Sequence, residues 1–160
     1  MNLKPLALLV AATLAAVVPS QGQSPCSPAQ FPLLNARGRV LGSADVMLHG
    51  DRVCVTYRVQ GDVWITDASL AVAETIEDIP GLFKGAPFAL GFPWMAGLSV
   101  PVREITGCVL MPANNPSGHI VVSTQANLRK FGIPIETWAG FRDGDNTCYF
   151  ETTCVPADEP

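Results

Sequence analysis

Five cysteines are the side chains of this chain with the clearest chemistry. They are Cys26, Cys54, Cys108, Cys148 and Cys154. An odd number leaves one thiol over, and two internal bridges among five cysteines allow about fifteen arrangements. Thiolates also bind metals, but the chain has no CxxC pair and only two histidines, so the ligand spacing of a zinc site is missing. We therefore expect disulfides, no metal and no cofactor.

Strand geometry narrows the pairing of these cysteines. If the chain between Cys148 and Cys154 is extended, their sulfurs lie roughly 20 Å apart, which is too far for a bond. Cys54 and Cys108 fall in strands that we expect to be neighbours, and Cys26 is the natural partner for a C-terminal cysteine. The fifth cysteine is either buried and inert or joins two chains, so a disulfide-linked homodimer stays open.

No residues form a recognised catalytic motif. A nucleophile needs a base beside it, usually His, but His49 lies in an expected turn and His119 opens an expected strand. Paired carboxylates for glycoside hydrolysis could come from Glu104, Glu136 and Glu151. Carboxylates on alternate faces of strands are ordinary surface residues, so we expect no catalytic residue and no enzyme. A hydrolase is the least favoured class.

A segment rich in aromatic residues, prolines and glycines spans residues 75–97. The prolines and glycines forbid a long regular element. An apolar loop of this length should pack on the domain or expose an adhesive patch. We predict a ligand-binding surface at 81–97, with Phe88, Phe92 and Trp94 as its contacts.

Two further features favour structural roles. Trp64 and Trp138 lie in expected strands, so we expect them to pack in the core. The residues Asp143-Gly144-Asp145-Asn146 resemble the start of a calcium loop. They lack the later bidentate Glu and sit where a hairpin turn is expected, which favours the turn.

The chain begins with the pattern of a secretory leader. Lys4 precedes an uncharged apolar run from Leu6 to Val18, and small residues at Ser20 and Gly22 suit a signal peptidase. The run is shorter than the ~20 residues that a spanning helix needs. We predict a signal peptide over 1–22 and secretion to the extracellular space, where disulfides persist.

Composition excludes several classes of partner. The formal net charge is −4, and without a basic stripe we expect no nucleic acid partner. Residues 155–160 are polar, so we expect no membrane anchor at that end and a soluble, released product. After the leader about 138 residues remain, which fits one domain with its own core.

Short stretches with β-type alternation follow a Pro-rich lead-in over 23–36. The clearest is Arg52–Val59, in which alternate residues from Val53 share one apolar face. A turn at Gly61-Asp62 and a strand over Val63–Ala73 come next, so we expect these two strands to form a β-hairpin.

The remaining pattern completes the expected fold. Further expected strands are Arg39–Leu48, Leu98–Leu110, Ile120–Ala126, Ile133–Trp138 and Thr147–Cys154. About seven strands without an amphipathic helix predict an all-β fold. We expect an antiparallel β-sandwich over 37–160, stapled by disulfides, with a long Pro/Gly-rich apolar loop.

Several short motifs follow one another between Gly38 and Phe150. They are Val55-Thr56-Tyr57, Gly61-Asp62-Val63-Trp64, Ser69-Leu70-Ala71-Val72-Ala73, Asp78-Ile79-Pro80, Gly85-Ala86-Pro87, Gly91-Phe92-Pro93-Trp94, Glu136-Thr137-Trp138-Ala139-Gly140 and Tyr149-Phe150. Their order resembles an extracellular all-β domain that is common in bacterial surface proteins and occurs in some eukaryotic secreted ones. Here Ser69 stands for the usual His, Trp94 stands for the usual Tyr, and the cysteines are extra. The resemblance implies an all-β fold and a role in adhesion or wall association, without catalytic residues.

These observations predict a secreted binding, matrix or wall-associated module whose partner is an extracellular glycan or protein. The alternative is a small secreted effector or inhibitor that binds a target protein through the loop Met111–His119.

Overall fold

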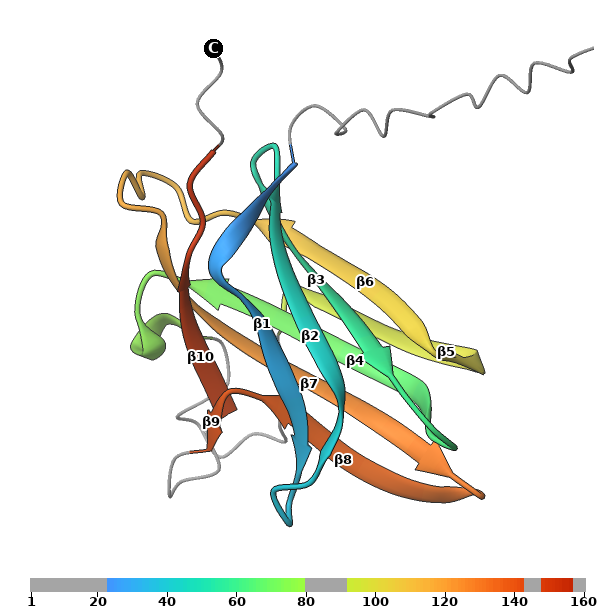
Figure 1. The fold of residues 1–160 in the computed structure, drawn as a ribbon. Coiled ribbons are helices and arrows are strands. Elements are labelled where there is room, and N and C mark those ends of the chain that lie inside the picture. The colour runs from blue at the N-terminus through green and yellow to red at the C-terminus, as the bar shows by residue number, and fades with distance from the viewer. Residues whose placement is uncertain (1–22, 80–91, 143–147, 157–160) are drawn as a thin grey trace, which may run out of the picture.

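The computed structural model consists almost entirely of antiparallel strands (Figure 1). It describes residues 23–79, 92–142 and 148–156. The described elements are β1 (Gln23–Asn35), β2 (Val40–His49), β3 (Arg52–Val59), β4 (Trp64–Ala73), the 3₁₀ helix η1 (Ile76–Asp78), β5 (Trp94–Val102), β6 (Glu104–Leu110), β7 (His119–Lys130), β8 (Ile133–Ala139), β9 (Phe141–Arg142) and β10 (Cys148–Thr153). The predicted all-β antiparallel fold is confirmed, with more strands than the about seven expected from alternation. No helix in the described part of the chain is long and apolar enough to cross a membrane.

The strands form one sheet that folds over into two facing layers. Its order is β5-β4-β7-β10-β1-β2-β3-β6, with β8 beside β1 and β7. In Figure 1, β1, β2 and β3 cross in front of β4 and β7. β10 pairs with the first part of β7 and β8 with its second part, so the two strands share the gap between β7 and β1. The layers are therefore joined along this side, while β5 and β6 end the sheet on the other.

The turn after β3 carries the chain from one layer to the other. β3 pairs with β2 and β6, whereas β4 pairs with β5 and β7. The predicted hairpin of these two strands is therefore wrong, although both strands exist. Stacking them places both apolar faces in the core, which is the burial that a sandwich requires. Tyr57 of β3 bridges the layers, because its buried hydroxyl donates a 2.8 Å hydrogen bond to the carbonyl of Ser69 in β4.

Apolar side chains from most strands fill the space between the layers. Fully buried members are Leu33, Val46, Val53, Val55, Ile65, Leu70, Ile120, Val122, Leu128 and Phe150. Val53, Val55 and Tyr57 belong to this core, so the alternation of Arg52–Val59 predicted the buried face of its strand correctly.

The Pro-rich segment ahead of the expected domain is a strand of the sheet. β1 pairs with β2 along most of its length and with β8 at its end. The ladder shifts register between Pro25 and Gln30, and in that interval the missing N–H of Pro28 removes no ladder bond. The bridge Cys26–Cys154 ties this strand to the chain beyond β10, as expected for Cys26.

The expected strand Leu98–Leu110 is two strands, β5 and β6, which turn at Arg103. β5 has its ladder with β4 and β6 has its ladder with β3, so the seam between them is closed by side chains. The indole of Trp94 lies over Gly107, and a Cβ on that glycine would stand 2.5 Å from the ring. The same ring stacks on Tyr57, with 6.3 Å between the ring centroids. Trp94 therefore fills the open side of the sandwich.

A second, smaller apolar cluster lies on β4 and β7. Its buried members are Ala71, Ala73, Ile79, Phe92 and Val121. Ala71 and Val121 alternate with residues of the main core, so this cluster occupies the outer face of the layer. Ile79 and Phe92 are the described residues nearest to 80–91 on either side. Both described ends of the predicted apolar loop thus pack on the domain.

Candidate functional site

The structure places the predicted aromatic contacts in different surroundings. Phe88 lies outside the described residues, as does the whole of the acidic turn Asp143–Asn146. Phe92 is only 8% exposed and packs in the smaller cluster. Trp94 is partly buried over Gly107. The described part of the loop therefore presents packed rings, and a ligand-binding role for Phe88, Phe92 and Trp94 stays a prediction.

The two tryptophans expected in the core differ in burial. Trp138 is buried, as expected. Trp64 is exposed, so its predicted core position is wrong. It is the first residue of β4 and lies opposite Arg129 in the ladder. The guanidinium of Arg103 lies 4.1 Å from the centroid of its ring. Trp64 therefore lies at a strand end, with the Arg103 cation over its ring and 42% of its surface exposed.

The three candidate carboxylates have separate partners, and the candidate histidine His119 contacts one of them, Glu151. The partners are Arg58 for Glu104 (2.6 Å), Gln125 for Glu136 (2.9 Å) and His119 for Glu151 (3.4 Å). The three carboxylates lie on β6, β8 and β10, and each has a partner of its own. Among the described residues, no group of three His, Cys, Asp or Glu side chains is placed to hold a metal ion.

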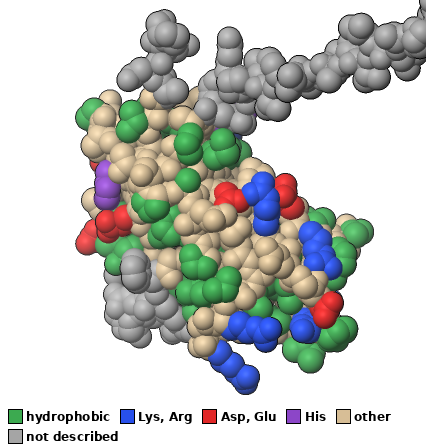
Figure 2. Space-filling view, in the orientation of Figure 1, with side chains coloured by type: hydrophobic (Ala, Val, Ile, Leu, Met, Phe, Trp, Pro, Cys, Tyr) green, Lys and Arg blue, Asp and Glu red, His purple; other side chains and the backbone are tan. Residues whose placement is uncertain are grey.

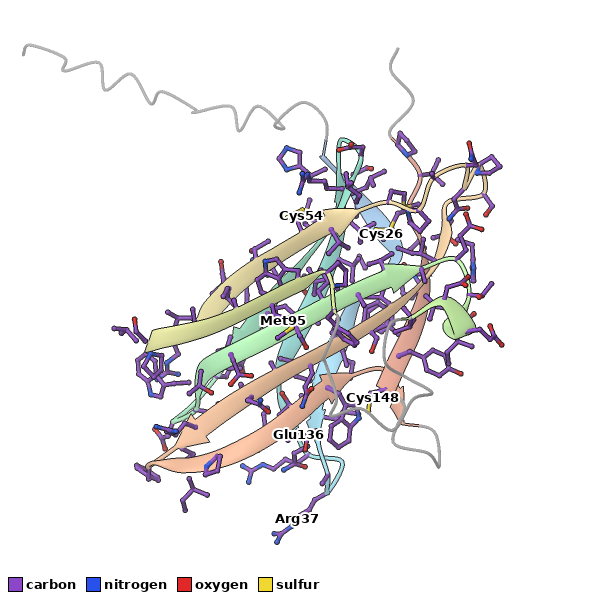
Figure 3. All side chains as sticks on the ribbon, turned by 180° about the vertical axis from the view of Figure 1, so that it is seen from behind. Cys26, Arg37, Cys54, Met95, Glu136 and Cys148 are labelled. Carbon is purple, nitrogen blue, oxygen red and sulfur yellow. A yellow bond between two sulfur atoms is a disulfide. The ribbon has the colours of Figure 1, made fainter. Side chains whose placement is uncertain are left out.

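The cysteines pair as strand geometry predicted. Cys54 and Cys108 are bonded across the β3–β6 ladder, and Cys26 is bonded to Cys154. Figure 3 shows Cys26 and Cys54 in the same half of the sandwich and Cys148 in the other. Cys148 belongs to neither disulfide and is 3% exposed. This burial favours the first of the two roles expected for the fifth cysteine.

An apolar cleft of about 550 Å³ opens at the end of the sandwich that carries the Cys26–Cys154 bridge. Three parts of the chain line it: the β2–β3 turn, the connection from β6 to β7, and the segment after β10. Its apolar lining includes Leu48, Leu110, Met111, Pro112, Pro116 and Val155. We call this site the loop cleft.

Backbone contacts hold the walls of the loop cleft together. The Met111 N–H donates a 2.8 Å hydrogen bond to the Asp51 carbonyl, and the Cys154 N–H donates one of 2.8 Å to the Gly118 carbonyl. Gly118 has φ +67°, and a Cβ there would collide with the carbonyl of Cys154. Only glycine allows this close approach. One wall is thus bonded to the next, and the wall at Cys154 is also fixed covalently.

Asn115 organises the loop between β6 and β7. Its side-chain amide donates a 2.7 Å hydrogen bond to the His119 carbonyl, and its backbone carbonyl accepts one of 3.3 Å from the Gly118 N–H. The Ser117 hydroxyl donates a 2.9 Å bond to the Asn115 side-chain oxygen. The loop therefore has its shape before a ligand arrives, which lowers the entropic cost of binding.

The lining of the loop cleft determines what it can bind. Its volume falls within the range of about 300–1,000 Å³ that is typical of ligand sites. Among the described lining residues, Asp51 carries the one carboxylate and Asn115 the one side-chain amide. No aromatic ring belongs to this lining, so a sugar would find no ring face on which to stack. The cleft suits aliphatic groups of a polypeptide better than a glycan.

Sequence reasoning identified the loop Met111–His119 as a possible contact but not the site around it. Leu48, Leu110 and Val155 lie far apart in the sequence and meet only because the sheet folds over. Comparisons with protein-family models, with curated proteins and with solved structures find no match.

Proposed function

We propose that this protein is a secreted, non-catalytic binding module that takes an apolar segment of a protein target into the loop cleft. The single observation that carries the proposal is a preformed apolar cavity of about 550 Å³ with hydrogen-bonded walls. Two intramolecular disulfides support secretion, because such bonds persist in oxidising compartments.

The rim of the loop cleft supports a protein target. Leu110 is 60% exposed and Val155 is also exposed, so apolar surface stands ready at the entrance. Covering such surface contributes about 25 cal/mol per Å² of apolar area. The Asp51 carboxylate and the Asn115 amide at the same cleft can orient a bound backbone by accepting or donating hydrogen bonds. The loop Met111–His119 thereby takes the role that the effector or inhibitor alternative gave it.

A displayed library of random peptides tests the proposal. Peptides are selected on the wild-type protein, and the affinity of enriched peptides is measured by fluorescence anisotropy for Leu110→Asp and Val100→Asp. Both positions are exposed apolar strand residues, 60% and 71% exposed, and only Leu110 lines the cleft. We expect peptides rich in aliphatic residues and at least about a tenfold loss for Leu110→Asp, from the burial of one aliphatic side chain.

Three outcomes would contradict the proposal. The first is selection that enriches no peptide, and the second is equal affinity for both variants. The third is glycan binding on an array that Trp94→Ala abolishes and Leu110→Asp leaves unchanged. That result would indicate that the protein binds a glycan through the aromatic loop 81–97.

A further inference from the structure

Exposed apolar side chains gather at the end of the sandwich opposite the loop cleft. They are Val40, Trp64, Val100, Phe131 and Ile133. They belong to strand ends or turns at the β1–β2, β3–β4, β5–β6 and β7–β8 connections. Single exposed apolar residues are ordinary, but a gathering of five at one end of a domain marks an interaction surface.

A small pocket shows that these connections converge. Its volume is about 290 Å³, and Arg39, Gly61, Lys130 and Ile135 line it. Two cations from different connections therefore face one space. Asp62 carries the one carboxylate among the described residues of its lining. This convergence places positive charge at one end of a chain whose formal net charge is −4.

Two more cations lie on the outer face of the same end. Arg129 is the ladder partner of Trp64, and Arg103 covers the ring of Trp64 while donating a hydrogen bond to the Gly61 carbonyl. Figure 2 shows Lys and Arg side chains along the lower right of the molecule, with hydrophobic side chains among them. We call the surface formed by Arg39, Trp64, Arg103, Arg129, Lys130, Phe131 and Ile133 the cationic end.

Phe131 is the most exposed of the five apolar residues at this end and is held in a costly backbone conformation. It is 82% exposed at the tip of the β7–β8 hairpin, with φ +49°, and Gly132 beside it has φ +79°. Such two-residue turns favour Asn or Asp at the first position, because a left-handed conformation strains most other residues. The ammonium of Lys130 lies 5.5 Å from the centroid of the ring. Phe131 thus strains the turn and buries little surface, so we infer that its ring serves an interaction and does not stabilise the fold.

We propose that the cationic end docks on the surface of an anionic lipid bilayer. Phe131 and Ile133, 82% and 66% exposed, enter the boundary between headgroups and acyl chains. Arg39, Arg129 and Lys130 contact the lipid phosphates around them. Apolar side chains that enter this boundary and basic side chains that meet anionic lipid both contribute to membrane binding.

The shape of the cationic end favours lipid over an acidic polymer. A polymer bound by charge alone gains nothing from exposed apolar tips, whereas a bilayer accepts a convex apolar tip without a matching pocket. Indole rings also favour the headgroup region, which suits Trp64 beside its two arginines. This inference does not depend on the loop cleft, which lies at the other end.

Co-sedimentation with vesicles tests the inference. Vesicles contain phosphatidylcholine alone or mixed with anionic phosphatidylglycerol. The protein should bind the mixed vesicles, and binding should weaken as salt is raised. Phe131→Asn should lower the partition coefficient at least about tenfold, and Lys130→Gln or Arg129→Gln should each lower it about fivefold. Met95 of β5 is also apolar and exposed but lies outside the cationic end, so Met95→Asn should leave the partition coefficient unchanged.

Stability separates this role from a structural one. Asn tolerates the left-handed conformation, so Phe131→Asn should raise the melting temperature while binding is lost. Binding should also shift tryptophan emission to the blue, and Trp64→Phe should remove that shift. Absence of binding to the mixed vesicles would overturn the inference, as would equal binding by Phe131→Asn. Binding to soluble polyglutamate that vesicles do not compete for would assign the surface to acidic polymers instead.

Discussion

The seam between β5 and β6 depends on the missing side chain of Gly107. A methyl group at this position would stand 2.5 Å from the indole of Trp94. The ring cannot retreat inward, because Tyr57 stacks on it and is fully buried. Gly107→Ala must therefore compress the seam or push Trp94 out of it. Overpacking of this kind costs about 1–3 kcal/mol, and a chain of this size should lose roughly 3–5 °C in melting temperature for each kcal/mol.

A double-mutant cycle isolates the contact between Gly107 and Trp94. With Trp94→Ala in place, the methyl group has room, and alanine is a better strand residue than glycine by roughly 0.5–1 kcal/mol. Gly107→Ala should therefore change sign, from destabilising in the wild type to neutral or stabilising in the variant. The coupling energy should exceed about 1 kcal/mol.

Guanidinium unfolding followed by far-ultraviolet circular dichroism measures all four proteins with the disulfides intact. Gly97→Ala is the matched control, since Gly97 lies in β5 and a Cβ there meets no atom within 4 Å. Equal stability of Gly107→Ala and Gly97→Ala would refute the reasoning. An equal loss with and without Trp94 would also refute it, because the cost would then come from the backbone.

Three further predictions concern buried groups. Burial raises the pKa of the Tyr57 hydroxyl well above its ordinary value, so its neutral form stabilises the fold fully below pH 10. Above that pH the Tyr57 hydroxyl ionises in the unfolded chain but not in the folded one, so the free energy of unfolding falls by up to ~1.4 kcal/mol per pH unit. In urea titrations at alkaline pH, Tyr57→Phe should remove most of this slope. Cys148 should resist maleimide in the native protein and react once denaturant unfolds it, since it is 3% exposed; rapid native labelling would contradict its burial. Replacing Cys26 and Cys154 by Ala should cost roughly 2–5 kcal/mol and weaken peptide binding at the loop cleft. Removing the other disulfide should cost a similar amount but leave peptide affinity unchanged.

Local pattern was enough to predict strands and one disulfide. Arg52–Val59 alternates cleanly and is bounded by glycine turns, so its limits and its buried face are as expected. The disulfide between Cys54 and Cys108 could then be predicted, because strands that lie side by side bring their cysteines within bonding distance. The Pro-rich β1 could not be predicted because prolines usually indicate a connection, whereas here Pro28 falls in a register shift and Pro25 and Pro32 lie within the ladder with β2.

Long-range pairing and surface clusters could not be predicted in the same way. The Gly61-Asp62 turn fits a hairpin and a crossing between layers equally well, and the choice depends on where all strands bury their apolar faces. The turn at Phe131 carries a residue that does not signal such a turn. Both candidate surfaces combine segments from three or four connections, so no single stretch of sequence reveals either of them.

The bridge between Cys26 and Cys154 spans 128 residues of sequence and joins the first described strand to the residue that follows the last one. Mechanically, it makes the domain a closed loop. If the protein were held by its two ends between a target and a surface, tension would pass through the sulfur–sulfur bond, and the sheet between would carry almost none of it. Its resistance to pulling would then depend on the redox state of the surroundings, whereas its resistance to heat would depend on the core as well as on the bridge.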